Sequence, residues 1–172
     1  MSSELRVDKI VPIDGAPTNG GGGIVQVVNL VKTDSFSTTS TSLVDITGFS
    51  LSITPQFNNS KIMVLASGYI SNQGNNHGVH LFFYRTRSGQ SDVEVGKSYN
   101  QNATVQSQTG GTFVIQNLDS PATTSATTYK VQITTESEAN TGEVYVNRSG
   151  EDTDNAQHSR VVSSITVMEV SG

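Results

Sequence analysis

Short runs of alternating apolar and polar residues follow one another from residue 24 to the end of the chain. Because successive side chains of a strand point to opposite faces, this alternation predicts half-buried β-strands. Turn-forming residues separate the runs, and no window shows a 3.6-residue period with helix caps. The predicted strands span 24–31, 43–47, 49–53, 61–70, 79–84, 93–95, 112–118, 129–134, 144–146 and 161–170.

About ten short strands with turns between them predict an all-β antiparallel fold, either a sandwich, a jelly roll or a barrel. The abundance of Val, Ile and Thr agrees with this class, because these residues favour strands. A chain of 172 residues is long enough for one such domain, which we place at 24–172.

Residues 1–23 differ from the rest and predict an arm followed by a linker. Leu5, Val7 and Ile10 alternate with charged residues, as in a short strand, and a stretch rich in Pro and Gly follows. The glycine run at 20–23 lacks the Lys-Ser/Thr ending of a phosphate-binding loop. Two interpretations stay open: a frayed terminus, or an anchor that adds a strand to a partner's sheet.

Two predicted strands carry apolar or aromatic residues on both faces, at 62–65 and 81–84. A sandwich strand that faces solvent normally alternates, so the outward side chains of these two need a cover. We expect another subunit to supply it, and a long loop over the strand is the alternative. The candidate interface residues are Met63, Leu65, Phe82 and Tyr84.

Charge and composition exclude several classes of protein. The net charge is −5 and no basic patch is visible, so we expect no nucleic-acid partner. No segment approaches the ~18 apolar residues of a membrane span, and the first residues do not have the pattern of a signal peptide. The chain has no cysteine, which excludes disulfides and thiolate chemistry.

The sequence offers few candidates for metal-binding or catalytic residues. His77 and His80 lie three apart, which places them on opposite faces of a strand, so a shared metal ion is not expected. The acidic stretch 151–155 has oxygen ligands that calcium prefers but lacks the pattern of an EF-hand, and we favour a solvated loop. Asp152 and Asp154 are the only metal candidates. No nucleophile motif or carboxylate pair is identifiable, so neither an enzyme nor a cofactor is predicted.

Several short sequence motifs occur along the chain in an order that is typical of one family of proteins. They are SELRVDKI at 3–10, DITG at 45–48, LSITP at 51–55, TTYKV at 127–131, VYVNRS at 144–149 and SSITVMEV at 163–170. The series resembles the tail-fibre-like C-terminal domain of virion structural proteins from tailed phages of marine and fresh waters. The resemblance implies a jelly-roll head similar in architecture to tumour-necrosis-factor-like heads, forming a homotrimer on the virion. It implies neither catalysis nor a cofactor.

The arm passes directly into the head through the linker 11–23, without the long shaft of a fibre. This favours a capsid decoration or cement protein, anchored by its arm to the major capsid protein or to another virion protein. The alternative is a tail or head fibre knob that recognises a host-surface glycan or protein through loops 73–78 and 150–159. A hydrolase acting on the host envelope has no support in the sequence beyond its Asp, Glu and His residues.

Overall fold

The computed structural model describes residues 23–72, 78–100, 110–135, 142–151 and 158–172, with the side chains of 99 and 100 left out. Within these ranges the chain forms ten strands and no helix, which confirms the predicted all-β class. It follows that the described part contains no helix suited to crossing a membrane. The strands are β1 (Ile24–Lys32), β2 (Phe36–Thr38), β3 (Val44–Ile53), β4 (Lys61–Asn72), β5 (Val79–Thr86), β6 (Val93–Asn100), β7 (Gly111–Asp119), β8 (Thr127–Thr135), β9 (Val144–Val146) and β10 (Ser163–Val170).

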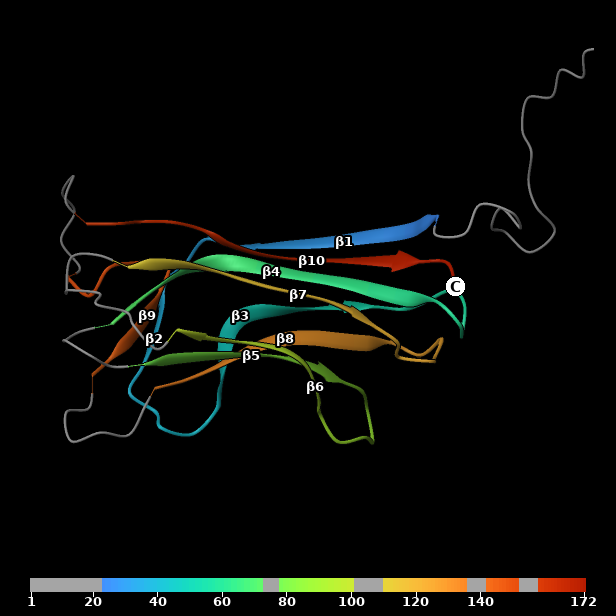
Figure 1. Ribbon diagram of the computed structural model, residues 1–172, viewed down its shortest axis with the longest axis horizontal. Coiled ribbons are helices and arrows are strands. Elements are labelled where there is room, and N and C mark those ends of the chain that lie inside the picture. Colours follow the sequence, from blue (N-terminus) through green and yellow to red (C-terminus); the bar gives the residue numbers. More distant parts are fainter. Residues whose placement is uncertain (1–22, 73–77, 101–109, 136–141, 152–157) are drawn as a thin grey trace, which may run out of the picture.

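The strands form two antiparallel sheets that pack face to face (Figure 1). The larger sheet has the order β1-β10-β4-β9-β2, and β7 pairs with the other edge of β4. The smaller sheet has the order β3-β8-β5-β6. Strands that are distant in sequence therefore lie side by side, as in a jelly roll, and the predicted jelly-roll sandwich is confirmed.

Several observed strands extend beyond the predicted runs, most of all β6, which ends at Asn100 instead of 95, and three further differences have a local cause. Segments 43–47 and 49–53 form one strand, β3, which bends at an irregularity between Asp45 and Ser50, where Gly48 has a φ of +72°. The short strand β2 was not predicted, because its sequence, FST, holds a single large apolar residue. Strand β10 begins at Ser163, two residues later than predicted, because the two valines before it face solvent.

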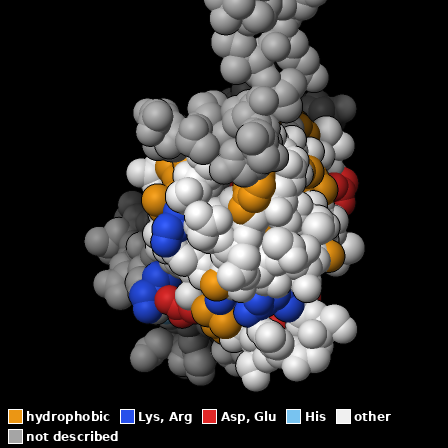
Figure 2. Space-filling model, turned by 90° about the vertical axis from the view of Figure 1, so that its right-hand side faces the viewer, with side chains coloured by type: hydrophobic (Ala, Val, Ile, Leu, Met, Phe, Trp, Pro, Cys, Tyr) orange, Lys and Arg blue, Asp and Glu red, His pale blue; other side chains and the backbone are white. Residues whose placement is uncertain are grey.

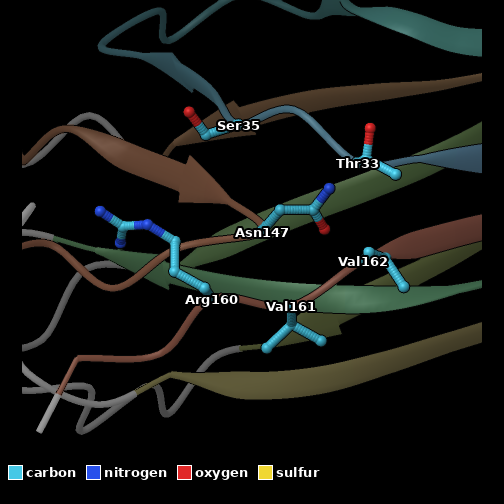
Figure 3. Close-up of a pocket in the computed structure, with 6 residues that line it drawn as sticks. All are labelled: Thr33, Ser35, Asn147, Arg160, Val161 and Val162. Carbon is cyan, nitrogen blue, oxygen red and sulfur yellow. The ribbon is translucent and has the colours of Figure 1, made fainter. Parts of the chain in front are cut away.

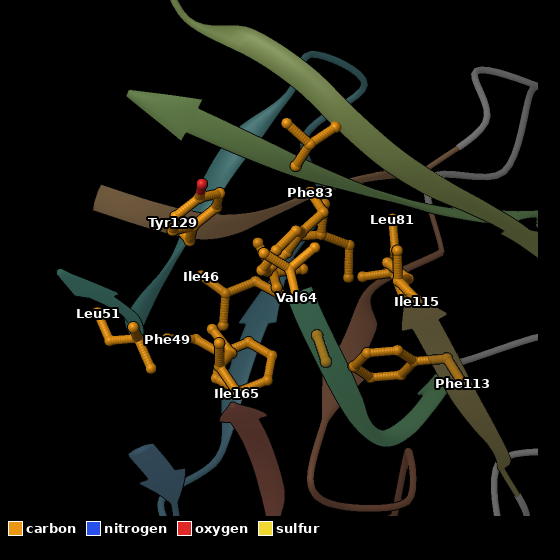
Figure 4. Packing of buried hydrophobic residues seen from close by; sticks show 14 of the residues in the cluster. Ile46, Phe49, Leu51, Val64, Leu81, Phe83, Phe113, Ile115, Tyr129 and Ile165 are labelled. Atoms are coloured by element: carbon orange, nitrogen blue, oxygen red, sulfur yellow. The ribbon is translucent and has the colours of Figure 1, made fainter. Parts of the chain in front are cut away.

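The core lies between the two sheets and is built from the inward positions of each strand (Figure 4). Phe83 and Tyr129 stack with ring centroids 6.0 Å apart, and Phe49 is fully buried. Ile165 of the larger sheet and Ile133 of the smaller one are also fully buried. Burying side chains of this size contributes about 1.5–3 kcal/mol each, so this layer is the main source of stability.

Candidate functional site

Several residues singled out in the sequence lie outside the described part of the chain. This holds for Leu5, Val7 and Ile10 of the proposed arm and for the metal candidates Asp152 and Asp154. Most of the two candidate recognition loops is also outside, at 73–77 and 152–157. These assignments stay predictions.

The structure separates the four candidate interface residues into two pairs. Met63 and Leu65 lie on the outward side of the larger sheet, because β4 buries its even-numbered residues from 62 to 66. Phe82 and Tyr84 lie on the outward side of the smaller sheet, where their rings stack at 6.3 Å. The two pairs are therefore on opposite faces of the sandwich and cannot belong to a single continuous patch.

The outward side of the larger sheet is predominantly apolar over β1, β10, β4 and β7. Strand register aligns Val27, Met168, Met63 and Leu118 in one row that crosses all four strands. We call the outward apolar residues of these strands the apolar face. Its members are Ile24, Val27, Val31, Met63, Leu65, Val114, Leu118, Met168 and Val170.

The outward side of the smaller sheet is charged. Lys130 forms ion pairs with Asp45 at 3.1 Å and Asp92 at 3.0 Å, and Lys97 lies 3.3 Å from Glu94. Figure 2, which views one end of the molecule, shows most of its visible Lys and Arg side chains toward this sheet. A charged side and an apolar side thus face opposite directions.

The part of the chain that the structure describes contains no metal-binding cluster. No group of three or more His, Asp or Glu side chains there could hold a metal ion. His158 lies 3.0 Å from Glu151, and no third ligand accompanies the pair among the described residues.

Arg85, Asp119 and Tyr129 form a cluster at the end of the sandwich near the C-terminus. Arg85 Nη1 donates to both carboxylate oxygens of Asp119, at 2.7 and 2.8 Å, and Tyr129 Oη donates to Asp119 Oδ2 at 2.8 Å. Burial and the neighbouring Asp119 carboxylate raise the pKa of Tyr129 far above its usual range. The phenol therefore stays protonated, and the cluster ties β5, β7 and β8 together rather than supplying a reactive group.

A buried polar cluster, which no local pattern in the sequence indicated, centres on Asn147. Its Nδ2 donates to the carbonyl oxygens of Lys32 at 2.9 Å and Asp34 at 3.0 Å, and Ser163 Oγ donates to its Oδ1 at 2.5 Å. Lys32, whose side chain is fully buried, donates to Asp34 at 2.8 Å and to the Thr47 carbonyl oxygen at 2.7 Å. The Lys32 ammonium holds the pKa of Asp34 below its usual range.

Beside this cluster lies an open pocket of about 530 Å³ (Figure 3). Its lining combines hydroxyl groups, a guanidinium and two valines, supplied by Thr33, Ser35, Asn147, Arg160, Val161 and Val162. The Asn147 side chain is committed to its three hydrogen bonds, so it shapes the pocket. Arg160, Thr33 and Ser35 are exposed and could contact a ligand.

The pocket and the beginning of the domain lie at opposite ends of the sandwich. Ile24 pairs with Val170 at one end of the β1–β10 ladder, and Lys32 pairs with Ser163 at the other. The pocket residues Thr33 and Val162 come directly beyond that second end. At a rise of about 3.3 Å per residue, the two ends are roughly 30 Å apart.

Comparison with known proteins shows similarity in fold alone. No protein-family model matches the chain, and no curated protein matches it. Among solved structures, a mutant VP2 protein of infectious bursal disease virus, from derived T=1 particles, is 13% identical, with a TM-score of 0.50 over 99% of this chain. Another structure of T=1 particles derived from this virus is also 13% identical, with a TM-score of 0.50 over 96%.

The chain spans less than half the length of these viral structures, 44% and 42% respectively. At this identity the likeness concerns the β-sandwich, which this chain shares with capsid proteins of a virus. It does not extend to individual residues.

Proposed function

We propose that this chain is a non-enzymatic structural protein of a virion. In this proposal it forms a trimeric knob that decorates or cements a capsid and that its N-terminal arm anchors. The apolar face carries the proposal, because exposed apolar patches of this extent mark interaction surfaces on folded proteins. The β-sandwich similar to viral capsid proteins gives further support for a virion location.

The ends of the described domain suit an anchored knob. Gly23, the first described residue, accepts a hydrogen bond from Ser171 N at 3.0 Å, so the arm leaves from the end where the chain terminates. An arm attached there would hold the opposite end of the sandwich away from the virion. Three arms on one trimer would bind together, which increases avidity without new contacts on each arm.

Removing residues 1–20 is expected to leave a folded trimer that no longer joins virions. Incorporation should fall more than tenfold, measured by mass spectrometry of particles assembled with the variant. A triple variant, Leu5→Ser, Val7→Ser and Ile10→Ser, should have a similar effect because it removes the apolar side of the arm. A matched control with Arg6→Ser and Asp8→Ser should incorporate normally. Wild-type incorporation of the deletion would show that the arm is a frayed terminus.

A second candidate function is recognition of a host-surface glycan by the same knob on a tail or head fibre. The pocket favours it, because a volume of about 530 Å³ suits a small saccharide. Arg160, whose Nη1 donates to the Ser159 carbonyl oxygen at 3.4 Å, supplies a positive charge that can attract a carboxylate, and the hydroxyls of Thr33 and Ser35 can pair with sugar hydroxyls. The arrangement points to an acidic sugar.

For this second function, Arg160→Ala is expected to lower binding of the isolated protein to host cells at least tenfold. Arg87→Ala is the matched control, because Arg87 Nη1 donates to the Pro121 carbonyl oxygen, away from the pocket. Competition with glucuronic acid, but not with glucose, should reduce binding of the unchanged protein. Equal binding by both variants would contradict a role for the pocket.

The number of copies per virion distinguishes the two functions. We would quantify this chain against the major capsid protein in purified particles by mass spectrometry. A ratio near one to one, or one trimer per local three-fold axis, supports decoration or cementing. A handful of trimers per particle supports a fibre and makes host recognition the leading function.

A further inference from the structure

The outward side of β1, β10, β4 and β7 is nearly free of charge. Counting β4 from Lys61 to Ser67, each strand contributes four outward positions, and only Lys61 is charged among the sixteen. The chain as a whole carries fifteen Asp and Glu residues, and none of them lies at these positions. The other outward positions are the nine members of the apolar face and the uncharged residues Asn29, Ser67, Thr112, Gln116, Ser164 and Thr166.

The apolar face is also well exposed to solvent in the single chain. More than half of the surface of Ile24, Val27, Val31, Val114 and Leu118 is accessible. These five residues lie on β1 and β7, the strands along the two sides of this part of the sheet. Exposed aliphatic side chains thus line both margins of the face.

Four of the polar side chains between the apolar ones are paired with each other. Asn29 Nδ2 donates to Thr166 Oγ1 at 2.8 Å, and the hydroxyls of Ser67 and Ser164 lie 3.3 Å apart. A buried polar group is unfavourable chiefly when it lacks a partner. Covering these four side chains therefore leaves the hydrogen bonds between them in place, which lowers the cost of excluding water here.

The extent of the face suits a specific interface. Four strands about 4.8 Å apart and about eight residues long, at about 3.3 Å per residue, cover roughly 500 Å² in projection. Because side chains project from the sheet, the accessible area exceeds this projected area and approaches the ~800 Å² that each partner buries in a standard interface. A loop of a few residues could not cover this area.

We infer that the apolar face binds further copies of this chain, and that it forms the trimer contact in the proposed knob. The inference rests on the proposed function, from which it takes the number of copies, three. A second copy is the favoured occupant because the chain has a net charge of −5 and identical copies repel wherever acidic residues meet, whereas this face has none. In a trimer the β1 margin of one face meets the β7 margin of the next, which closes a ring of three.

The inference excludes Phe82 and Tyr84 from the contact. Their side chains are half-buried beside the ion pairs of Lys130 and Lys97 on the opposite side of the sandwich. Two copies meeting through that side would have to desolvate these charges. The charged side is therefore the outside of the assembly.

The test is the oligomeric state of the full chain, measured by sedimentation equilibrium. The double variant Val114→Glu and Leu118→Glu should dissociate to monomers, with the dissociation constant raised at least a hundredfold. The control, Ser50→Glu and Ser52→Glu on the smaller sheet, adds the same charge and should stay assembled. Circular dichroism melting of each variant reports whether it is folded.

Disulfide cross-linking provides a second test, in which the proposed contact produces a new covalent product instead of a loss of assembly. The chain has no cysteine, so Val27→Cys and Leu118→Cys introduce single thiols on the two margins of the face. Mixing these two variants under oxidation should give disulfide-linked chains, and Ser50→Cys mixed with either should not. Absence of cross-linking in the first mixture would overturn the proposed contact.

The outcomes separate this inference from the proposed function. A trimer that resists Val114→Glu and Leu118→Glu but dissociates with Tyr84→Glu overturns the inference and leaves the virion role standing. A dimer that these two face substitutions dissociate supports the inference and corrects the number of copies. A chain that stays monomeric at high concentration overturns the inference, and virion incorporation then tests the structural role by itself.

Discussion

Replacing Asn147 by alanine is expected to destabilise the domain by about 4 kcal/mol, a large part of the ~5–15 kcal/mol that stabilises a typical domain. Asn147 is 2% exposed and holds a φ of +66°. The substitution removes three buried hydrogen bonds, each contributing about 1 kcal/mol, and places a Cβ-bearing residue without a compensating side chain in the left-handed region, at a cost of about 1 kcal/mol. Denaturant unfolding at a fixed chain concentration measures the change.

Two further variants show which part of the effect belongs to the side chain. Asn147→Gly loses the same hydrogen bonds but relieves the backbone, so it should be about 1 kcal/mol more stable than Asn147→Ala. Asn58→Ala is the control, because Asn58 is exposed in a turn, and it should change stability by less than about 0.5 kcal/mol. A small effect of Asn147→Ala would show that the cluster is not needed to join β1, β9 and β10.

Replacing Glu169 by glutamine is expected to destabilise the domain by about 3 kcal/mol near neutral pH. Glu169 is fully buried at the end of β10 and accepts hydrogen bonds from Gln26 Nε2 at 2.6 Å, Gln56 N at 2.7 Å and Phe57 N at 3.2 Å. A glutamine amide has one oxygen in place of two and turns an NH₂ group toward these donors. The loop that joins β3 to β4 would lose its attachment.

The effect of Glu169 should depend on pH in a defined direction. Burial raises the pKa of Glu169, but hydrogen bonds to its carboxylate outweigh burial and bring the pKa below the usual range. A lowered pKa contributes stability above the unfolded-state value of about 4.3, and this contribution is lost as the pH falls through the folded-state value. The difference in unfolding free energy between wild type and Glu169→Gln should therefore shrink from about pH 7 to about pH 3.

The control for this pH series is Glu94→Gln. Glu94 is exposed beside Lys97, and surface ion pairs contribute about 0–1 kcal/mol. Its unfolding free energy should follow that of wild type throughout the series. A constant difference between Glu169→Gln and wild type would contradict the proposed role of the ionised carboxylate.

The alternation of side chains along the chain is sufficient to locate most of the strands. Nine of the ten observed strands overlap a predicted run, because a two-residue period is a local property that each strand displays in its own sequence. The strand β2 escaped prediction because its three residues, FST, include a single large apolar side chain, whereas the equally short β9, VYV, consists of strand-forming residues. Composition likewise indicated an all-β class and the lack of thiol chemistry, because both follow from residue counts and not from which strands pair.

The residues that share one face of the sandwich could not be identified before the strand pairing was known. Met63 and Phe82 carry the same local signal, an apolar residue at an outward position, yet they lie on opposite sides of the sandwich. The difference comes from neighbouring strands, since register sets Met63 between Met168 and Leu118, whereas Phe82 lies between Gln132 and Lys97. The pairing of strands that are distant in sequence cannot be recognised from the alternation of residues within one strand.

The order of residues along the chain was sufficient to predict about ten strands in an all-β domain, and to predict that two of the strands are apolar on both sides. Those properties depend on the order of side chains within one strand. The fold, in contrast, was needed to show that Asn147 joins Lys32 to Ser163, and that the apolar and charged sides face away from each other. These contacts depend on which strands become neighbours, and packing of the whole core selects that arrangement.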